Sequence, residues 1–379
     1  MIHLLTIIGA RPQIIKAAAI SRAIKEHFSG QVEETILHTG QHYDDNMSEV
    51  FFRELGVHAP DVNLHVGSAS HGVQTARIIE GVEKVLLETP FDGVIVYGDT
   101  NSTLAAAVAA GKMDVPVFHV EAGLRSFNMA MPEEQNRIVC DALSSILFAP
   151  TKTAVQNLEH EGFNGARRFK NGMGQKVVLS GDVMYDNSLF FSGIADVQSD
   201  IIERMGLTYR GFVLATIHRP ANTDDAAHLQ AIFRALLDIS EQEQIDVVIP
   251  LHPRTRKMLP QQLTPDLLAR VEKSARLRII EPASFFEIIR LEKNAHVVMT
   301  DSGGVQKEAF FYGTPCVILR SETEWVEIVD AGAGIIADAD ETRIKAAYKA
   351  LAGKKITFPP LFGDGKASEK IIEEIIRYF

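Results

Sequence analysis

The segment from Thr300 to Ala309, TDSGGVQKEA, has the clearest pattern for binding an anion. An apolar run ends just before it and a helical pattern follows. Ser302, Gly303 and Gly304 have small or absent side chains, so backbone N–H groups at a helix N-terminus can approach a phosphate closely. Glu308 could accept hydrogen bonds from adjacent sugar hydroxyls. The segment predicts a nucleotide site, and the alternative is a connection that uses glycine only for turn geometry.

A second set of candidate residues is acidic and lies near the ends of predicted strands: Asp99, Glu121 and the pair Glu133–Glu134. Carboxylates that share a closed site repel one another and lose hydration, which raises some of their pKa values and suits them to act as acids or bases. Asp99 could instead belong to a helix cap, and the glutamate pair could be first-turn residues. Glu121 directly follows the apolar run 117–120, where a structural role more often selects a turn residue.

Basic residues follow other predicted strands. The segment Gly9 to Lys16, GARPQIIK, is neither a GxGxxG fingerprint nor a Walker A loop, which disfavours dehydrogenase and NTPase functions. Arg11 can offer a fork of donors to a diphosphate, with a surface arginine as the alternative.

His218 and His252 occupy equivalent strand-end positions, with Arg219 and Arg254 nearby. A third ligand at recognisable spacing is missing, so we expect phosphate binding rather than a metal site, with a structural role as the alternative for His252.

The composition is that of a globular enzyme. The 379 residues exceed what one core usually serves, so we expect two domains. The net charge of −11 argues against nucleic-acid and membrane partners. Cys140 and Cys316 form no paired motif, and the apolar run from Ile2 to Ile8 is too short to span a membrane, so we expect a cytoplasmic protein.

Short β-branched runs alternate with helical patterns along the chain, which is typical of parallel sheets covered by helices. Polar clusters follow the strands, so we expect two domains with a cleft between them and a boundary just after Gly181. The tail 367–379 has the pattern of an amphipathic helix that needs a partner surface. The predicted strands are 4–8, 35–39, 93–97, 117–120, 146–149 and 177–179, then 212–217, 247–250, 277–280, 297–300 and 316–319.

Taken in order, the motifs GARPQIIK, TGQHYD, YGDTNST, HVEAGLRS, MPEEQNR, TIHRPAN, LHPRT, TDSGGVQKEA and FGDGKASEKI closely resemble the non-hydrolysing UDP-N-acetylglucosamine 2-epimerase family. The resemblance runs from Gly9 to the C-terminus. It implies a GT-B-like α/β fold with two Rossmann-like domains: an N-terminal domain, 1–181, with the catalytic carboxylates, and a UDP-binding domain, 182–365. A C-terminal helix, 366–379, would cross back to the first domain. The resemblance also implies a homodimer.

The family inverts C2 of the sugar by anti elimination of UDP and syn addition of UDP to the other face, without a cofactor or metal. The resemblance assigns catalysis to Asp99, Glu121, Glu133 and His218. It does not indicate which carboxylate serves which face. The residues that it implies for UDP and substrate binding are Arg11, Lys16, His252, Arg254, Ser302, Gly303, Gly304, Glu308, Thr323 and Glu324.

Two departures from the family pattern bear on substrate and regulation. Residues 322–327 read ETEWVE where many members that act on UDP-N-acetylglucosamine have TTERPE. The combination of TEWVE with FNM and MPEE more closely resembles the branch that acts on UDP-2,3-diacetamido-2,3-dideoxyglucuronic acid. Trp325 could shape that pocket or could be a core aromatic. The segment from Gln41 to Asp45 lacks the QHR-type loop through which some members bind an activating UDP-sugar, which disfavours such activation.

Three other functions remain open. A hydrolysing 2-epimerase would release UDP and free N-acetylmannosamine. A GT-B glycosyltransferase would release UDP only with an acceptor. A non-catalytic UDP-sugar sensor would bind without turnover, and the complete acidic set argues against it.

Overall fold

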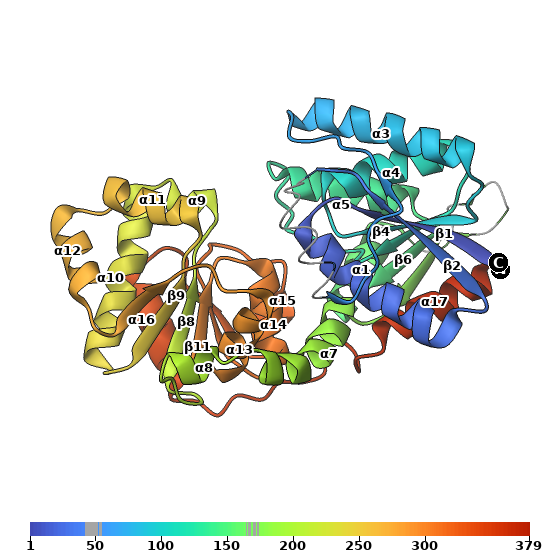
Figure 1. Cartoon of the computed structure of the whole chain (residues 1–379). Coiled ribbons are helices and arrows are strands. Elements are labelled where there is room, and N and C mark those ends of the chain that lie inside the picture. Colours follow the sequence, from blue (N-terminus) through green and yellow to red (C-terminus); the bar gives the residue numbers. More distant parts are fainter. Residues whose placement is uncertain (42–51, 53–54, 164, 166–167, 170–171, 173) are drawn as a thin grey trace. The chain divides into compact units, whose positions relative to one another are not determined.

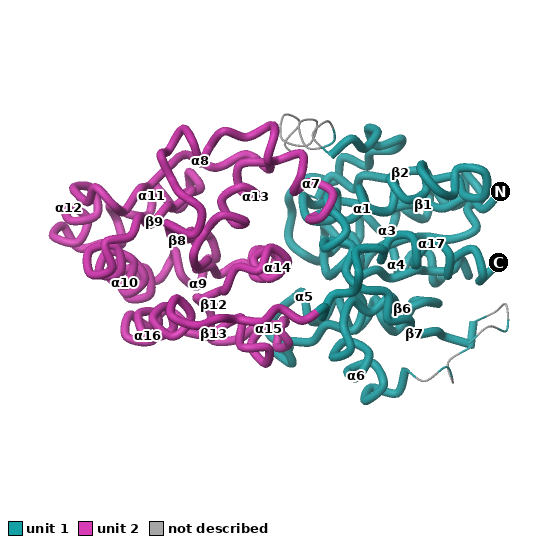
Figure 2. Tube along the Cα trace, turned by 90° about the horizontal axis from the view of Figure 1, so that it is seen from below, with its two compact units in different colours: residues 1–187, 360–379 teal, residues 188–359 magenta. Residues whose placement is uncertain are grey.

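The computed structural model describes the whole chain except residues 42–51, 53–54, 164, 166–167, 170–171 and 173. The chain forms two compact units, which are shown in different colours in Figure 2. Unit 1 comprises residues 1–187 and 360–379, and unit 2 comprises residues 188–359. The chain passes from unit 1 to unit 2 within α7, Val183–Gln198.

Unit 1 is built on a parallel sheet with the strand order β3-β2-β1-β4-β5-β6-β7, of which Figure 1 labels β2, β1, β4 and β6. The central strands are buried almost throughout, as expected for strands that are covered by helices on both faces. The strands are β1 Ile2–Ile8, β2 Val32–His38, β3 Val62–Asn63, β4 Gly93–Tyr97, β5 Val117–Val120, β6 Ile146–Ala149 and β7 Lys176–Leu179. The helices are α1 Arg11–Ala23, η1 Ile24–Phe28, α3 His71–Glu88, α4 Asn101–Lys112, α5 Pro132–Leu143, α6 Lys152–His160 and α17 Ala367–Tyr378.

Unit 2 repeats this construction with the strand order β10-β9-β8-β11-β12-β13, again parallel. The strands are β8 Phe212–Thr216, β9 Asp246–Pro250, β10 Leu277–Ile280, β11 Val297–Thr300, β12 Cys316–Ile318 and β13 Gly334–Ile336. The helices are α8 Ile201–Arg204, α9 Pro220–Thr223, α10 Ala226–Gln242, α11 Pro253–Gln262, α12 Pro265–Lys273, α13 Phe285–Asn294, α14 Gly303–Phe311, α15 Val326–Asp330 and α16 Glu341–Ala352.

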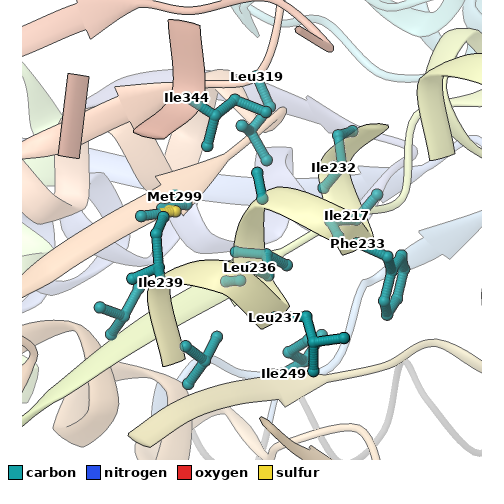
Figure 3. Close-up of a cluster of buried hydrophobic side chains, with 14 of the residues drawn as sticks. Ile217, Ile232, Phe233, Leu236, Leu237, Ile239, Ile249, Met299, Leu319 and Ile344 are labelled. Carbon is teal, nitrogen blue, oxygen red and sulfur yellow. The ribbon is translucent and has the colours of Figure 1, made fainter. Parts of the chain in front are cut away.

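The largest apolar cluster of unit 2 lies where α10 packs on the sheet. Figure 3 shows Phe233, Leu236 and Leu237 of α10 near Ile249 of β9 and Met299 of β11. All five side chains are fully buried. This core fixes the strands of unit 2, and therefore the polar loops at their ends.

The C-terminal helix α17 lies in unit 1, where it packs against α1 and η1. Its apolar face is buried through Ile371, Ile372 and Ile375. The Asp186 carboxylate accepts hydrogen bonds from Ala367 N at 3.1 Å and from Ser368 N at 2.8 Å. A negative charge at these two N–H groups stabilises the beginning of the helix.

The predicted α/β, GT-B-like class is confirmed, and every strand predicted from the sequence is present. Among the described residues, the structure adds β3 and β13, which the sequence analysis missed. The first has only two residues, and the second follows the small-residue run from Ala331 to Ala333, which reads as a loop. Strands this short carry too few residues for an apolar pattern to be visible.

Candidate functional site

In unit 1, several predicted site residues follow neighbouring strands of one parallel sheet. Arg11 begins α1 just after β1, Asp99 follows β4, and Glu121 follows β5. β4 pairs with both β1 and β5. The carboxyl ends of parallel strands meet at one edge of the sheet, so the topology brings the three residues to the edge where α/β proteins bind ligands.

Glu121 is held against Lys16 of α1. The Lys16 ammonium lies 2.8 Å from the Glu121 carboxylate, and the two side chains are only 11% and 10% exposed. The backbone of Glu121 has a φ of 71°, a left-handed conformation that is uncommon for a residue with a side chain. Backbone strain of this kind persists where the surroundings fix it and clusters at functional sites. The sequence predicted both residues for the site, and the structure joins them as an ion pair.

Asp99 is paired with Arg137 of α5. The guanidinium lies 2.7 Å from the Asp99 carboxylate, which is 34% exposed, whereas the arginine is 3% exposed. Burial raises the pKa of Asp99, and the charges of Glu121 and Glu133 raise it further, while Arg137 and Lys16 oppose this rise. The protonated form of Asp99 is therefore more accessible than that of an ordinary aspartate, which suits an acid.

Glu133 and Glu134 differ in their exposure to solvent. Glu133 is exposed, whereas Glu134 is buried and accepts hydrogen bonds from Ser126 N at 3.0 Å and Phe127 N at 2.9 Å. Glu134 also contacts Arg137, with Nε donating at 3.0 Å. Glu134 thus holds the preceding loop, and Glu133 is the one of the two that is open to solvent.

Arg137 was missed by the sequence analysis, although it lies in the quoted motif MPEEQNR. Its spacing of three residues from Glu134 on a predicted helix is the signal that could have indicated it. Its contact with Asp99 joins residues 38 positions apart and had no signal in the sequence.

In unit 2, His218 is fixed by the buried Asp301. The Asp301 carboxylate lies 3.1 Å from His218 Nδ1. It also accepts hydrogen bonds from the backbone N–H groups of His218 and Arg219, at 3.2 and 3.1 Å, and from the Asn222 amide at 3.1 Å. Burial opposes its charge, but His218 and these donors outweigh burial and lower the pKa of Asp301. The sequence analysis included Asp301 in TDSGGVQKEA without giving it this function.

Helix α14 begins at Gly303, just after Asp301 and Ser302, and its first turn is the predicted phosphate cradle. Ser302 caps the helix, since its hydroxyl accepts a hydrogen bond from Val305 N at 3.5 Å. A Cβ atom at Gly303 would find its nearest neighbour at 3.5 Å, and one at Gly304 at 3.8 Å, which are ordinary contacts. Neither glycine has a positive φ. Backbone geometry and packing do not require glycine here, which favours the ligand interpretation over the turn interpretation.

The segment after β12 is held by polar contacts within unit 2. Arg320 donates two hydrogen bonds to the Glu324 carboxylate, at 3.0 and 2.9 Å. The Thr323 hydroxyl donates to Gln306 of α14 at 2.6 Å. Trp325 is buried, and the Lys307 ammonium lies 4.1 Å from the centre of its ring. The segment ETEWVE, which differs from the family pattern, therefore packs on α14, the helix of the predicted phosphate cradle.

His252 and Arg254 contact other protein groups in the structure. His252 is the N-cap of α11, and its Nδ1 accepts a hydrogen bond from Arg254 N at 3.2 Å. The Arg254 guanidinium donates to both oxygens of Asp224, at 2.7 and 2.8 Å. These contacts match the structural alternative for His252, and binding of a ligand by either residue stays a prediction.

Three further predictions concern the loop after β2, a metal site and a membrane span. Of the segment Gln41 to Asp45, only Gln41 is described; it accepts a hydrogen bond from the Ser102 hydroxyl at 2.7 Å. In the described part of the chain, no three His, Cys, Asp or Glu side chains are grouped to hold a metal ion. None of the described helices has the length and apolar character needed to cross a membrane.

Comparisons with known proteins agree with the motifs. Residues 23–376 match the family model of UDP-N-acetylglucosamine 2-epimerase. The UDP-2,3-diacetamido-2,3-dideoxy-D-glucuronate 2-epimerase of Pseudomonas aeruginosa is 46% identical over 376 residues, which are 99% of each chain. The crystal structure of Methanocaldococcus jannaschii UDP-GlcNAc 2-epimerase in complex with UDP-GlcNAc and UDP is 38% identical, with a TM-score of 0.86 over 100% of both chains.

A more distant structure, Phytolacca americana UGT2, is 11% identical, with a TM-score of 0.58 over 100% of this chain and 94% of its own, and shares the fold alone. The family assignment follows from the full-length matches. The chain belongs to the UDP-N-acetylglucosamine 2-epimerase family and is an isomerase, a non-hydrolysing UDP-sugar 2-epimerase.

Proposed function

We propose that this epimerase interconverts UDP-2,3-diacetamido-2,3-dideoxyglucuronic acid with its C2 epimer, in preference to UDP-N-acetylglucosamine and UDP-N-acetylmannosamine. The observation that carries the proposal is the full-length identity of 46% to an epimerase named for the diacetamido uronate, against 42% to a relative named as a UDP-N-acetylglucosamine 2-epimerase homolog and 38% to two named for UDP-N-acetylglucosamine. The segment ETEWVE supports it, because it replaces the TTERPE of many members that act on UDP-N-acetylglucosamine and its Trp325 packs on Lys307 of α14, the helix of the predicted phosphate cradle.

In this proposal, the carboxylates of unit 1 remove the proton from C2 and return it. A base removes the proton from C2 while the C1–O bond breaks, so the electron pair forms the C1–C2 double bond and UDP leaves. A proton then returns to C2 on the opposite face as UDP adds back to C1. Glu121, whose charge is stabilised by Lys16, suits proton removal, and Asp99, whose protonated form is favoured by burial, suits proton delivery. Glu133 is the third candidate, and the functions of donor and acceptor exchange when the reaction runs backwards.

Residues of unit 2 hold the leaving group in this proposal. The N–H groups of Gly303 and Gly304 and the Ser302 hydroxyl bind phosphate, with the positive end of α14 directed at the anion. His218, which Asp301 orients, stabilises the departing diphosphate, and Glu308 accepts hydrogen bonds from the ribose.

The other members of the predicted binding set have supporting functions. Arg11 of unit 1 contributes charge to the diphosphate. We assign Lys16, His252, Arg254, Thr323 and Glu324 to the same binding set, as the resemblance implies. We further propose that the enzyme is cytoplasmic and forms a homodimer. Light scattering at several protein concentrations would test the dimer.

The test is NMR analysis of products from a panel of UDP-N-acetyl sugars that includes the diacetamido uronic acid. In D2O, the preferred substrate should acquire deuterium at C2 in both epimers, because the proton is exchanged during inversion. Faster turnover of UDP-N-acetylglucosamine would contradict the substrate assignment. Retention of protium at C2 with inversion would contradict the mechanism, and free sugar released with every turnover would indicate hydrolysis.

A further inference from the structure

A chain of charges that is buried except at Glu161 lies beneath the catalytic edge of unit 1, and the proposed mechanism does not use it. His119 of β5 contacts Asp141 of α5 through Nδ1 at 2.7 Å and the Gly98 carbonyl through Nε2 at 2.8 Å. The Asp141 carboxylate lies 2.8 Å from the Arg125 guanidinium. The same guanidinium donates hydrogen bonds to both carboxylate oxygens of Glu161, each at 2.7 Å. His119 and Asp141 are fully buried.

The contacts of His119 define its protonation state. A neutral imidazole donates from one nitrogen and accepts at the other, whereas both partners here are acceptors: a carbonyl oxygen and a carboxylate. Both ring nitrogens must therefore carry a proton. Burial opposes this charge, but the hydrogen bond to Asp141 and the negative charge of Asp141 raise the pKa of His119 well above its usual value. With Arg125 and Glu161 included, the two positive and two negative charges balance.

One end of this chain fixes the backbone next to Asp99. Gly98 has a φ of 61°, and its carbonyl oxygen is the group that His119 holds. A Cβ atom at Gly98 would lie 3.0 Å from Lys16 Nζ and 4.0 Å from Glu121 Oε1. The residue held by His119 therefore precedes Asp99 in the chain and lies close to the Lys16–Glu121 ion pair.

Asp141, the next member of the chain, fixes the turn that presents Glu121. The Asp141 carboxylate accepts a hydrogen bond from Gly123 N at 3.2 Å, two residues after Glu121. Both residues have left-handed backbones, with φ of 71° at Glu121 and 79° at Gly123. Asp141 also lies on α5, the helix that carries Arg137, the partner of Asp99. The imidazolium thus joins the two loops that carry the candidate acid and base.

We propose, on the basis of the function proposed above, that His119 is a positioning residue for epimerisation: its imidazolium links the Gly98 carbonyl to Asp141 and so fixes the Asp99 and Glu121 carboxylates relative to each other. His119 contacts the backbone and Asp141, so it acts on the substrate through other residues. A shift of the two carboxylates by about 1 Å would reduce turnover by about 100-fold.

The protonation state is tested in the native protein. Nitrogen-15 NMR of histidine-labelled enzyme, with His119 assigned through its backbone resonances, should show two N–H groups on the ring from pH 6 to pH 9. A neutral ring with a single N–H in this range would overturn the proposal. This measurement needs only the wild-type fold, so it is decisive even where a His119 variant folds poorly.

The positioning function is tested with His119→Gln, because both N–H donors of a glutamine lie on one nitrogen and cannot bridge the Gly98 carbonyl and Asp141 as the two ring nitrogens do. Glu161→Gln is the matched control, since it removes a charge from the same chain at the end away from Gly98. With UDP-2,3-diacetamido-2,3-dideoxyglucuronic acid, or UDP-N-acetylglucosamine if the panel selects it, His119→Gln should lower kcat about 100-fold and leave KM and UDP affinity within about threefold. Glu161→Gln should keep kcat within about threefold of wild type.

The outcomes separate this inference from the function on which it rests. Wild-type kcat in folded His119→Gln, or an equal loss in Glu161→Gln, would overturn the positioning function. Asp99→Asn and Glu121→Gln are measured in parallel. If both retain wild-type turnover, the assignment of the catalytic carboxylates fails, whatever His119 does.

Discussion

Replacement of Asp301 by Asn tests whether a buried carboxylate holds His218 in place. The carboxylate accepts hydrogen bonds from two backbone N–H groups and from Asn222, and it contacts His218 Nδ1. An asparagine offers one oxygen, and its NH2 group would face N–H donors. A hydrogen bond to a charged group contributes about 1.5–3 kcal/mol, and a buried donor left without an acceptor costs about 1–3 kcal/mol. We therefore expect the free energy of unfolding of unit 2 to fall by about 3 kcal/mol.

Trp325 makes the measurement possible, because it is the only tryptophan of the chain and lies buried in unit 2. Its fluorescence during urea unfolding reports on that unit. Asp224→Asn is the matched control, since Asp224 is 47% exposed where it pairs with Arg254, and an exposed pair contributes about 1 kcal/mol or less. If Asp301→Asn and Asp224→Asn destabilise unit 2 equally, the reasoning is refuted.

The same substitution predicts a dependence on pH. The pKa of Asp301 is lowered in the folded protein, so its ionisation stabilises the fold above the unfolded pKa, near 4, and this stabilisation is lost as pH falls through the folded pKa. The difference in unfolding free energy between wild type and Asp301→Asn should therefore be full at pH 7 and shrink in acid. A difference that grows as pH falls would contradict this sign.

Three further substitutions test the division of tasks. Glu121→Gln should lower kcat by about 100-fold to 10,000-fold and leave UDP affinity, measured by calorimetry, nearly unchanged; an equal loss of affinity would contradict it. Ser302→Asp should weaken UDP binding by at least about tenfold, because it sets a like charge against phosphate, and unchanged affinity would remove the cradle from the site. Arg137→Gln removes a charge that counteracts the raised pKa of Asp99, so the pH profile of kcat should move to higher pH; a move to lower pH would contradict the pairing.

The sheets and the groups that follow them could be predicted because each depends on neighbours in the sequence. Apolar runs predict the strands, and parallel strands bring Asp99 and Glu121 to one edge of a sheet. The partners of these residues could not be predicted in the same way. Arg137 meets Asp99 across 38 positions, and Asp301 meets His218 across 83. Such contacts depend on tertiary packing, of which a single sequence carries no periodic signal.

Glu133 and Glu134 show a further limit of the sequence. Adjacent residues on a helix point in directions about 100° apart, so a site formed by both side chains was geometrically unfavourable from the beginning. Which of the two is buried depends on the loop 124–131, whose backbone N–H groups need an acceptor. The sequence named the pair, and only the structure separates the exposed residue from the buried one.

The two units share a construction in which a buried charge holds a more exposed group of opposite charge or polarity. Arg137 is 3% exposed and its partner Asp99 is 34% exposed; Asp301 is 0% exposed and its partner His218 is 53% exposed. Removing a buried charge leaves other buried groups without partners, whereas removing the exposed group frees its partner to meet water. His218→Asn should therefore lower kcat with a loss of stability of about 1 kcal/mol or less, while Asp301→Asn lowers both. If His218→Asn destabilised unit 2 as much as Asp301→Asn, His218 would be part of the fold, and its assignment to the leaving diphosphate would lose its support.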